Sequence, residues 1–314
     1  MKKKMLVASL GIAVCASASA AAKDNLLNDK FLQEFRTAFS LSEINAQQKS
    51  REVVLINDFE EWKKTVYKEP FEDGGYIVNG DVHIPDDARL LEFYLRGLVP
   101  QSGENVKFIV ARYRGYDDIW NSTQKKFISY CVSNSFGADH TRVVRAMEDA
   151  SSVWEQSADI KIVHNVAEDH NCHQNNQRVV FDVRPVEVNG QYLARAFFPS
   201  YPRVSQNVLI DKSALSYANE GPGLTLTGIL RHELGHVIGA RHEHTRPEAG
   251  ACFEDEKWRP VTNYDPFSVM HYPQCNGLGD WTLTLTHSDK NGSACTYGAA
   301  PSFQIDQRVC RRQP

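Results

Sequence analysis

The sequence has little charge excess, no internal repeat and no low-complexity tract. Its 314 residues carry 35 lysines and arginines against 39 aspartates and glutamates. Such a balance predicts no binding to nucleic acid or to an anionic membrane. The apolar run near the N-terminus is shorter than the roughly 20 residues that a membrane-spanning helix needs. We therefore expect one large or two modest globular domains, no membrane span, no nucleic-acid partner and a monomer.

The N-terminus has the pattern of a secretory signal peptide. Met1 to Lys4 is basic, Met5 to Val14 is apolar, and Ala16 to Ala22 is a stretch of small residues. A basic start, a short apolar core and small residues at the cleavage point are the features of such peptides. We therefore expect residues 1–22 to be removed and the protein to be secreted, either to the extracellular space or to the periplasm.

Cysteine is absent from Ala16 to Tyr130, and the six cysteines that follow contain no Cys-x2-Cys pair. A cysteine-bound metal is therefore not expected, whereas an even number in an exported chain predicts three disulfides. Six cysteines allow about fifteen pairings, and closeness in sequence favours Cys131–Cys172, Cys252–Cys275 and Cys295–Cys310. The uneven distribution also predicts a boundary near residue 120, between an N-terminal segment (23–120) and a C-terminal domain (121–314).

One run in the C-terminal domain has the spacing of a metal site. His232 and His236 are four residues apart and share one helix face, with Glu233 beside them. Gly239 lets the chain leave the helix and return with His242. Three imidazoles leave one tetrahedral position of Zn²⁺ open for water, which is typical of a catalytic site. We assign one zinc ion, and the sequence gives no support for calcium.

The surrounding residues favour this interpretation over an accidental pattern on a surface helix. The full spacing HExxHxxGxxH fixes five positions, and chance rarely meets all of them. Apolar residues at helical spacing predict a buried helix here, and Thr225 or Thr227 can cap its start. These apolar residues are interpreted as core: Ile229, Leu230, Leu234, Val237 and Ile238.

The chain around this run resembles the metzincin metallopeptidases. His242-Glu243-His244 and Ser268-Val269-Met270-His271-Tyr272 are similar to the astacin branch, whereas Ala194 to Pro199 and Leu285 to Asp289 are similar to the matrixins. The likeness covers about residues 126–298. It implies that Met270 lies beneath the metal, that Tyr272 is a switchable ligand, and that Glu243 is a salt-bridge residue near the site.

The roles of two residues follow from the chemistry of peptide hydrolysis. Glu233 is the natural general base, since it can take a proton from water and pass it to the leaving amine. Tyr272 can donate a hydrogen bond to the developing oxyanion. The segment Ala194, Arg195, Ala196 and Phe197 resembles the edge strand on which metzincins align an extended substrate, although Phe197 fits a core position equally well.

The hydrophobic pattern after residue 126 predicts an α+β fold. A helix is expected over Thr141–Trp154, and a last helix near Ser288–Tyr297 fits the family. We expect a twisted mixed five-stranded sheet that packs on two long helices, one of which is the zinc helix. An irregular C-terminal subdomain with the last helix follows. The five strands are expected over Lys126–Val132, Ile160–His164, Val179–Val183, Leu193–Phe198 and Val208–Asp211.

The segment 23–120 fits either an accessory domain or a propeptide that covers the active site. A helix is expected over Leu26–Phe39, with strands near Val53–Ile56 and Val106–Tyr113. A secreted peptidase must stay latent until export, which favours the propeptide. Matrixin precursors use a propeptide cysteine, which this segment lacks. Astacin precursors use an aspartate after a glycine, and Asp81 resembles it, although an ordinary hairpin turn also fits this position.

We therefore expect a secreted zinc endopeptidase made as a latent precursor, acting on protein or peptide substrates. A non-catalytic binding protein or adhesin on the same scaffold is the alternative from another class. A toxin-like protease of narrow specificity is a third. The intact Glu233 and the three intact histidines argue against the non-catalytic alternative.

Overall fold

A mixed five-stranded sheet forms the centre of the C-terminal domain in the computed structural model, which describes residues 57–97, 108–254 and 257–310. Its strand order is β7-β6-β8-β10-β9. The first four strands are parallel, and β9 is antiparallel to β10. The order leaves β9 at an edge, beside the zinc helix. The strands are β6 (Ile128–Val132), β7 (Ile162–His164), β8 (Phe181–Val186), β9 (Ala194–Arg195) and β10 (Asn207–Asp211).

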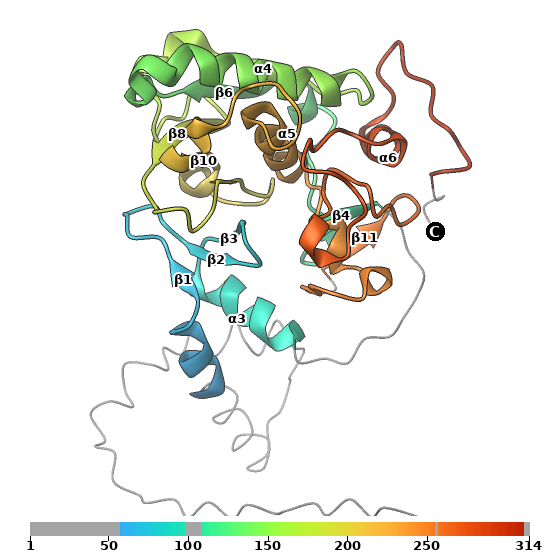
Figure 1. Cartoon of the computed structure of the whole chain (residues 1–314), viewed down its shortest axis with the longest axis horizontal. Coiled ribbons are helices and arrows are strands. Elements are labelled where there is room, and N and C mark those ends of the chain that lie inside the picture. Colours follow the sequence, from blue (N-terminus) through green and yellow to red (C-terminus); the bar gives the residue numbers. More distant parts are fainter. Residues whose placement is uncertain (1–56, 98–107, 255–256, 311–314) are drawn as a thin grey trace, which may run out of the picture. The chain divides into compact units, whose positions relative to one another are not determined.

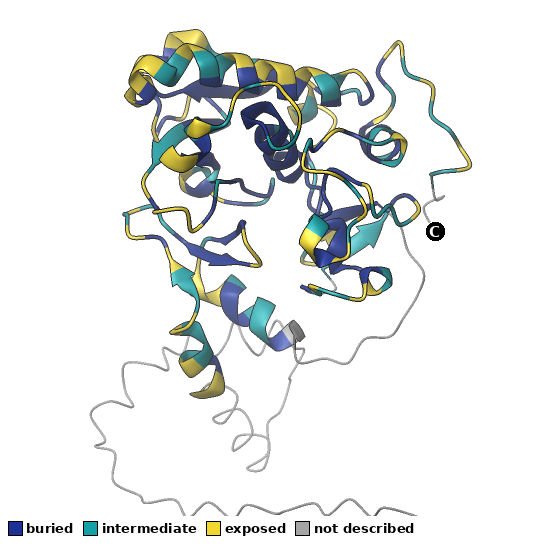
Figure 2. Ribbon diagram, viewed as in Figure 1, coloured by how far each residue is buried: buried dark blue, intermediate teal, exposed yellow. Residues whose placement is uncertain are grey.

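Two long helices, α4 (His140–Glu155) and α5 (Leu226–Val237), pack against each other (Figure 1). The indole of Trp154 is fully buried between them and donates to the Arg231 carbonyl at 3.0 Å. Thr225 caps α5 by accepting from the Gly228 amide. Figure 2 shows that α4 has one exposed face, whereas α5 is buried on nearly all sides. The expected sheet and helix pair are therefore confirmed, with α5 central.

The C-terminal part is mostly irregular, as expected, and ends in α6 (His287–Tyr297), which starts with a capping box between Thr286 and Asp289. The strand in its described residues, β11 (Trp258–Pro260), pairs with β4 (Ile109–Tyr113), which also pairs with β5 (Tyr116–Asp117). The described segments also contain short 3-10 turns at Gln124–Lys126, Asn134–Asp139, Val166–Asn171, Arg203–Ser205, Lys212–Ser216, Glu243–Thr245, Pro247–Ala249 and Pro273–Cys275.

The described N-terminal segment, residues 57–97, precedes the domain and is named the prosegment for this position. It contains a helical stretch over residues 57–63, a small antiparallel sheet and the helix α3 (Asp87–Gly97). The hairpin between the second and third strands turns at Asn79 and Gly80, which have φ of 51° and 99°. The strands are β1 (Tyr67–Lys68), β2 (Tyr76–Val78) and β3 (Val82–Ile84). The helix expected over Leu26–Phe39 and the strand near Val53–Ile56 lie outside the described residues.

The strand expected near Val106–Tyr113 is observed as β4, but it belongs with the C-terminal domain. Besides pairing with β11, its Ala111 amide donates to the Gly239 carbonyl at 2.7 Å, and the Arg241 amide donates to the Ile109 carbonyl at 3.0 Å. These bonds join β4 to the loop that carries His242. Residues 109–113 are thus part of the body that holds the site.

The three disulfides link Cys131 to Cys172, Cys252 to Cys275 and Cys295 to Cys310, so the pairing favoured by sequence proximity is confirmed. The strand expected over Leu193–Phe198 is shorter, because only Ala194 and Arg195 pair with β10. Phe197 instead packs in the core against Phe181 and Trp120. No helix in the described part of the chain is long and apolar enough to cross a bilayer.

Gly239 and Gly115 offer a matched test of the turn after α5, since their φ angles are 86° and 87°. A Cβ on Gly239 would lie 2.4 Å from the Asp118 carbonyl oxygen, whereas one on Gly115 meets nothing within 4 Å. Both alanine substitutions carry the left-handed cost of about 1–2 kcal/mol, but only Gly239→Ala must also displace backbone. We expect a clearly larger drop of the thermal midpoint for Gly239→Ala; equal drops would contradict the close approach.

Candidate metal centre

The three histidines of the expected site come together. His232 and His236 project from α5, and His242 follows the turn at Gly239. The Nε2 atom of His242 lies 3.2 Å from Nε2 of His232 and 3.2 Å from Nε2 of His236. All three side chains are buried, so the nitrogens converge in a space that bulk water does not fill.

Each imidazole uses its other nitrogen to donate a hydrogen bond. Nδ1 of His232 donates to the Val269 carbonyl at 2.7 Å, and Nδ1 of His236 donates to the Ala240 carbonyl at 2.9 Å. Nδ1 of His242 bonds to a Glu254 carboxylate oxygen at 2.5 Å. In the neutral form of each imidazole, these bonds place its one N–H on Nδ1 and leave the Nε2 lone pair free for a metal ion.

This arrangement fits a zinc ion. Three lone pairs at such short range repel unless a cation lies between them. Nitrogens bound tetrahedrally at 2.0–2.1 Å would be about 3.3 Å apart, close to the observed separations. The histidine trio together with Asp81 also forms a group whose ligand atoms all lie within 4.8 Å of one another. Zinc can therefore be held by His232, His236 and His242.

Asp81 of the prosegment reaches the same point. Its Oδ1 lies 3.1 Å from Nε2 of His242, and its Oδ2 lies 3.3 Å from Nε2 of His232. Burial alone would raise the pKa of Asp81, but His242 and His232 lower it well below its usual range. Its Oδ1 has no hydrogen-bond partner among the described residues. Asp81 was expected to be either a hairpin-turn residue or a ligand at the metal site. It has both positions, because it closes the hairpin turn and its carboxylate points at the histidines.

Glu233 and Tyr272 border the histidines. The Glu233 side chain is buried, and its Oε2 has no hydrogen-bond partner within the described ranges. Burial, and next the charge of Asp81, raise its pKa well above the usual range. The Tyr272 ring stacks on His232 at 5.5 Å, and burial followed by Asp81 raises the phenol pKa. A carboxylate and a phenol thus adjoin the point where the imidazoles converge.

Met270 and Glu243, two further residues expected at the site, are both buried. Met270 is fully buried, and a Cβ on Gly235 would lie only 2.3 Å from its Sδ, so the thioether fits directly under α5. Glu243 forms a buried ion pair with Arg246 at 2.7 Å, and burial raises its pKa to about 8. Its amide also donates to the Met270 carbonyl at 2.8 Å.

Glu254 is a site residue that sequence reasoning missed. Its carboxylate accepts a hydrogen bond from His242 and forms an ion pair with Arg241 at 2.7 Å. It also lies 3.3 Å from Nε2 of His244. Burial opposes ionisation, but His242 lowers the pKa of Glu254 well below its usual range. It follows the disulfide residue Cys252 in an irregular segment, where no fixed spacing to the histidines exists. The only available signal was an acidic residue beside an anchored cysteine.

The expected substrate segment is covered by the prosegment. Ala194, Ala196 and Phe197 are buried, and the guanidinium of Arg195 is completely enclosed. Its Nη2 forms an ion pair with Glu69 of the prosegment at 2.8 Å. β9 has a sheet neighbour on one side only, so its other edge remains unpaired by main chain within the described structure.

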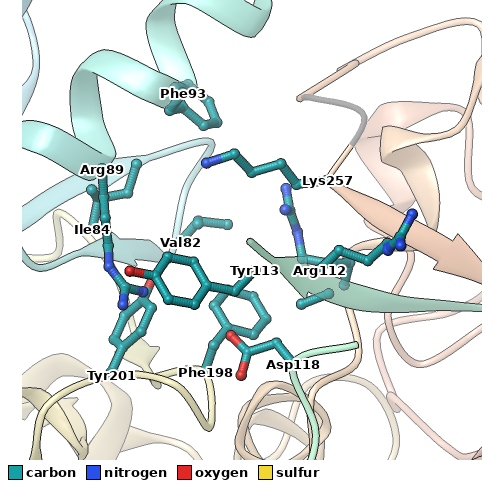
Figure 3. Close-up of a pocket in the computed structure, with 12 residues that line it drawn as sticks. Val82, Ile84, Arg89, Phe93, Arg112, Tyr113, Asp118, Phe198, Tyr201 and Lys257 are labelled. Carbon is teal, nitrogen blue, oxygen red and sulfur yellow. The ribbon is translucent and has the colours of Figure 1, made fainter. Parts of the chain in front are cut away.

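A pocket lies along the prosegment on the other face of β3. Val82 and Ile84 line it, whereas Asp81 and His83 alternate with them and face the histidines and Glu69. Figure 3 shows Arg89 of α3 in this pocket beside the ring of Tyr201. The pocket therefore belongs to the contact between the prosegment and the domain beneath it, and not to the metal centre.

Comparison with known proteins agrees with this site. The family model for matrixin matches residues 120–249, which include β6 to β10 and all three histidines. Matrix metalloproteinase-A of Caenorhabditis elegans is 24% identical over 153 residues, which are 48% of this chain. Over these residues the chain is similar to the matrixin peptidases. It spans only 29% of the length of that relative.

Two solved structures are also similar to this chain. Myroilysin is 16% identical with a TM-score of 0.43, over 60% of this chain and 98% of its own. High choriolytic enzyme 1, a hatching enzyme zinc-protease of Oryzias latipes, is 17% identical with a TM-score of 0.35, over 57% of this chain and 96% of its own.

Replacing Glu254 tests its contact with His242. We expect Glu254→Gln to lower zinc affinity about 10- to 100-fold, as loss of a residue that orients a ligand does. Competition with a chromophoric chelator measures this directly. Glu187→Gln is the matched control, since that exposed carboxylate pairs with Lys212 and does not touch the site. An unchanged zinc affinity in Glu254→Gln would mean that His242 is held by its backbone alone.

Proposed function

We propose that this protein is a metzincin, a secreted zinc endopeptidase made as a latent precursor. The observation that carries the proposal is the convergence of His232, His236 and His242 on the carboxylate of Asp81, with Glu233 alongside. The first four are a complete tetrahedral ligand set, and the fifth is a base without a hydrogen-bond partner at its Oε2 among the described residues. The even cysteine pairing and the N-terminal sequence pattern support secretion.

In the proposed reaction, the protein residues position water and manage its proton. When bound, zinc supplies a Lewis acid that polarises the water and the scissile carbonyl. Glu233 accepts the proton of the attacking water and then delivers it to the amine that leaves. Tyr272 donates its phenol hydrogen to the carbonyl oxygen as that oxygen gains negative charge. The unpaired edge of β9 aligns an extended peptide by main-chain hydrogen bonds, which supports cleavage within chains.

In the proposed latent form, Asp81 holds the position that water needs. Gly80 lets the hairpin come close, because a Cβ there would lie 3.2 Å from the Tyr272 ring. Asp81 also acts on Tyr272, because its charge, after burial, raises the pKa of the phenol. Asp81 thus withholds both the open coordination position and the oxyanion donor from a substrate.

The proposed end of the propeptide follows from β4. This strand is joined to β11 and to the loop of His242, so removing it would unpair the domain beneath the site. We therefore place the start of the mature domain before residue 109, earlier than the boundary near 120 that the cysteine distribution predicts. The region cut during activation then lies between α3 and β4. N-terminal sequencing of the secreted form measures this point.

Replacing the base separates a peptidase from a binding protein on the same scaffold. We expect Glu233→Gln to keep its zinc, because the ligands are unchanged, and to lose about 10²- to 10⁴-fold in kcat. Casein hydrolysis by the processed protein, with and without a chelator, measures this beside metal analysis. Wild-type protein that binds zinc yet never cleaves casein or peptides would favour the binding protein or adhesin. Cleavage of one substrate alone would favour the narrow toxin-like protease.

Replacing Asp81 tests latency. We expect an uncleaved Asp81→Ala precursor to hydrolyse a peptide substrate, because the fourth position becomes accessible to water. Glu61→Ala is the matched control, since that exposed prosegment carboxylate pairs only with Lys64 among the described residues and should leave the precursor silent. The assay must include a gel that shows the variant uncleaved. A silent Asp81→Ala precursor with bound zinc would reduce Asp81 to a turn residue.

A further inference from the structure

Arg195 is a buried cation whose counterion comes from the prosegment. The Glu69 carboxylate accepts from Nε of Arg195 at 2.9 Å and from its Nη2 at 2.8 Å, in a bidentate pair. Both side chains are completely enclosed. The pair joins residues 126 positions apart, so it spans the contact between the prosegment and β9. Arg195 therefore depends on a segment that the proposed activation removes.

The receiving side of this pair is built for a carboxylate. The buried hydroxyl of Tyr192 also donates to Glu69, so the domain beneath offers three hydrogen-bond donors to one carboxylate. The remaining Arg195 nitrogen donates to the side-chain oxygen of Asn207, which is neutral and orients the guanidinium. A planar guanidinium with a fixed fork binds carboxylates with high geometric specificity.

This carboxylate position is close to the reacting groups. Arg195 lies on the edge strand β9, which packs against the zinc helix α5. His83 lies 3.7 Å from Glu69 and two residues after Asp81, a separation of about 7 Å along a strand. The position is thus about two residues of extended chain from the metal ligands.

Departure of the prosegment leaves Arg195 and Tyr192 without the group they bind. The fork of Arg195 and the hydroxyl of Tyr192 then remain arranged for a carboxylate from elsewhere. We propose that Arg195 and Tyr192 form a substrate subsite for an acidic side chain, within three residues of the scissile bond, which Glu69 occupies in the precursor. This rests on the proposed peptidase function and adds its specificity.

Paired peptides test the subsite on the processed enzyme. Each pair carries Glu or Gln at one position from three before to three after the scissile bond, in an otherwise neutral peptide. At one position we expect kcat/KM to be about 10- to 100-fold higher for Glu, as for hydrogen bonds to a charged group. In Arg195→Gln the ratio should fall towards one. Arg195→Lys keeps the charge but loses the fork, so its ratio should be intermediate.

The outcomes separate the subsite from the peptidase function. Arg178→Gln is the control, because that exposed arginine pairs with Glu168 away from β9 and should keep the wild-type ratio. Zinc content verifies folding, and Arg195→Lys serves if Arg195→Gln lacks zinc. Wild-type cleavage with equal rates for Glu and Gln at every position overturns the subsite but leaves the peptidase intact. So does a Glu preference that survives in both variants. No cleavage of any peptide contradicts the peptidase itself.

Discussion

The convergence of three imidazole nitrogens, 3.2 Å apart in the two closest pairs, is the constraint on which the rest of this structure depends. Unprotonated nitrogens at that range are stabilised by a cation between them, and zinc fits their separation. Their orientation is fixed from outside, by the Val269 and Ala240 carbonyls and by Glu254. Gly239 then turns the chain so that the third imidazole arrives, and Met270 fills the volume beneath α5. Each of these features acts by holding a nitrogen in place.

The prosegment places two carboxylates against groups that bind anions or metal ions. Asp81 meets the histidines, and Glu69 meets Arg195 on the neighbouring strand. Both contacts are buried, so the desolvation cost of each carboxylate is offset only while its positively charged or metal-binding partner remains in place. In the proposed precursor, the prosegment thus occupies with its own carboxylates the positions that ligands take in the mature enzyme. In this account, a water replaces the first carboxylate and a substrate side chain replaces the second.

Features set by short-range pattern were predictable from sequence. The zinc helix, a threonine cap at its start and the three disulfides follow from periodicity, hydrogen-bonding capacity and proximity, and the structure has all of them, with Thr225 as the cap of the two candidates. Glu254 and Glu69 were not found, because each reaches its partner only through the folded chain. β4 was expected as a strand but assigned to the segment before the boundary, since a cysteine count carries no information about pairing. Apolar and polar residues alternate only weakly over Leu193–Phe198. The strand is shorter than expected because Phe197 packs in the aromatic core.

The central claim is that zinc is bound by three histidines and by Asp81 in the precursor. A crystal structure of the zinc-loaded precursor, with anomalous data collected at the zinc edge, tests it most directly. The account predicts one strong anomalous peak bonded to Nε2 of His232, His236 and His242 and to a carboxylate oxygen of Asp81. A peak with water in the fourth position and Asp81 turned away would contradict the latent state. An absence of any peak at the histidines would contradict the metal centre itself.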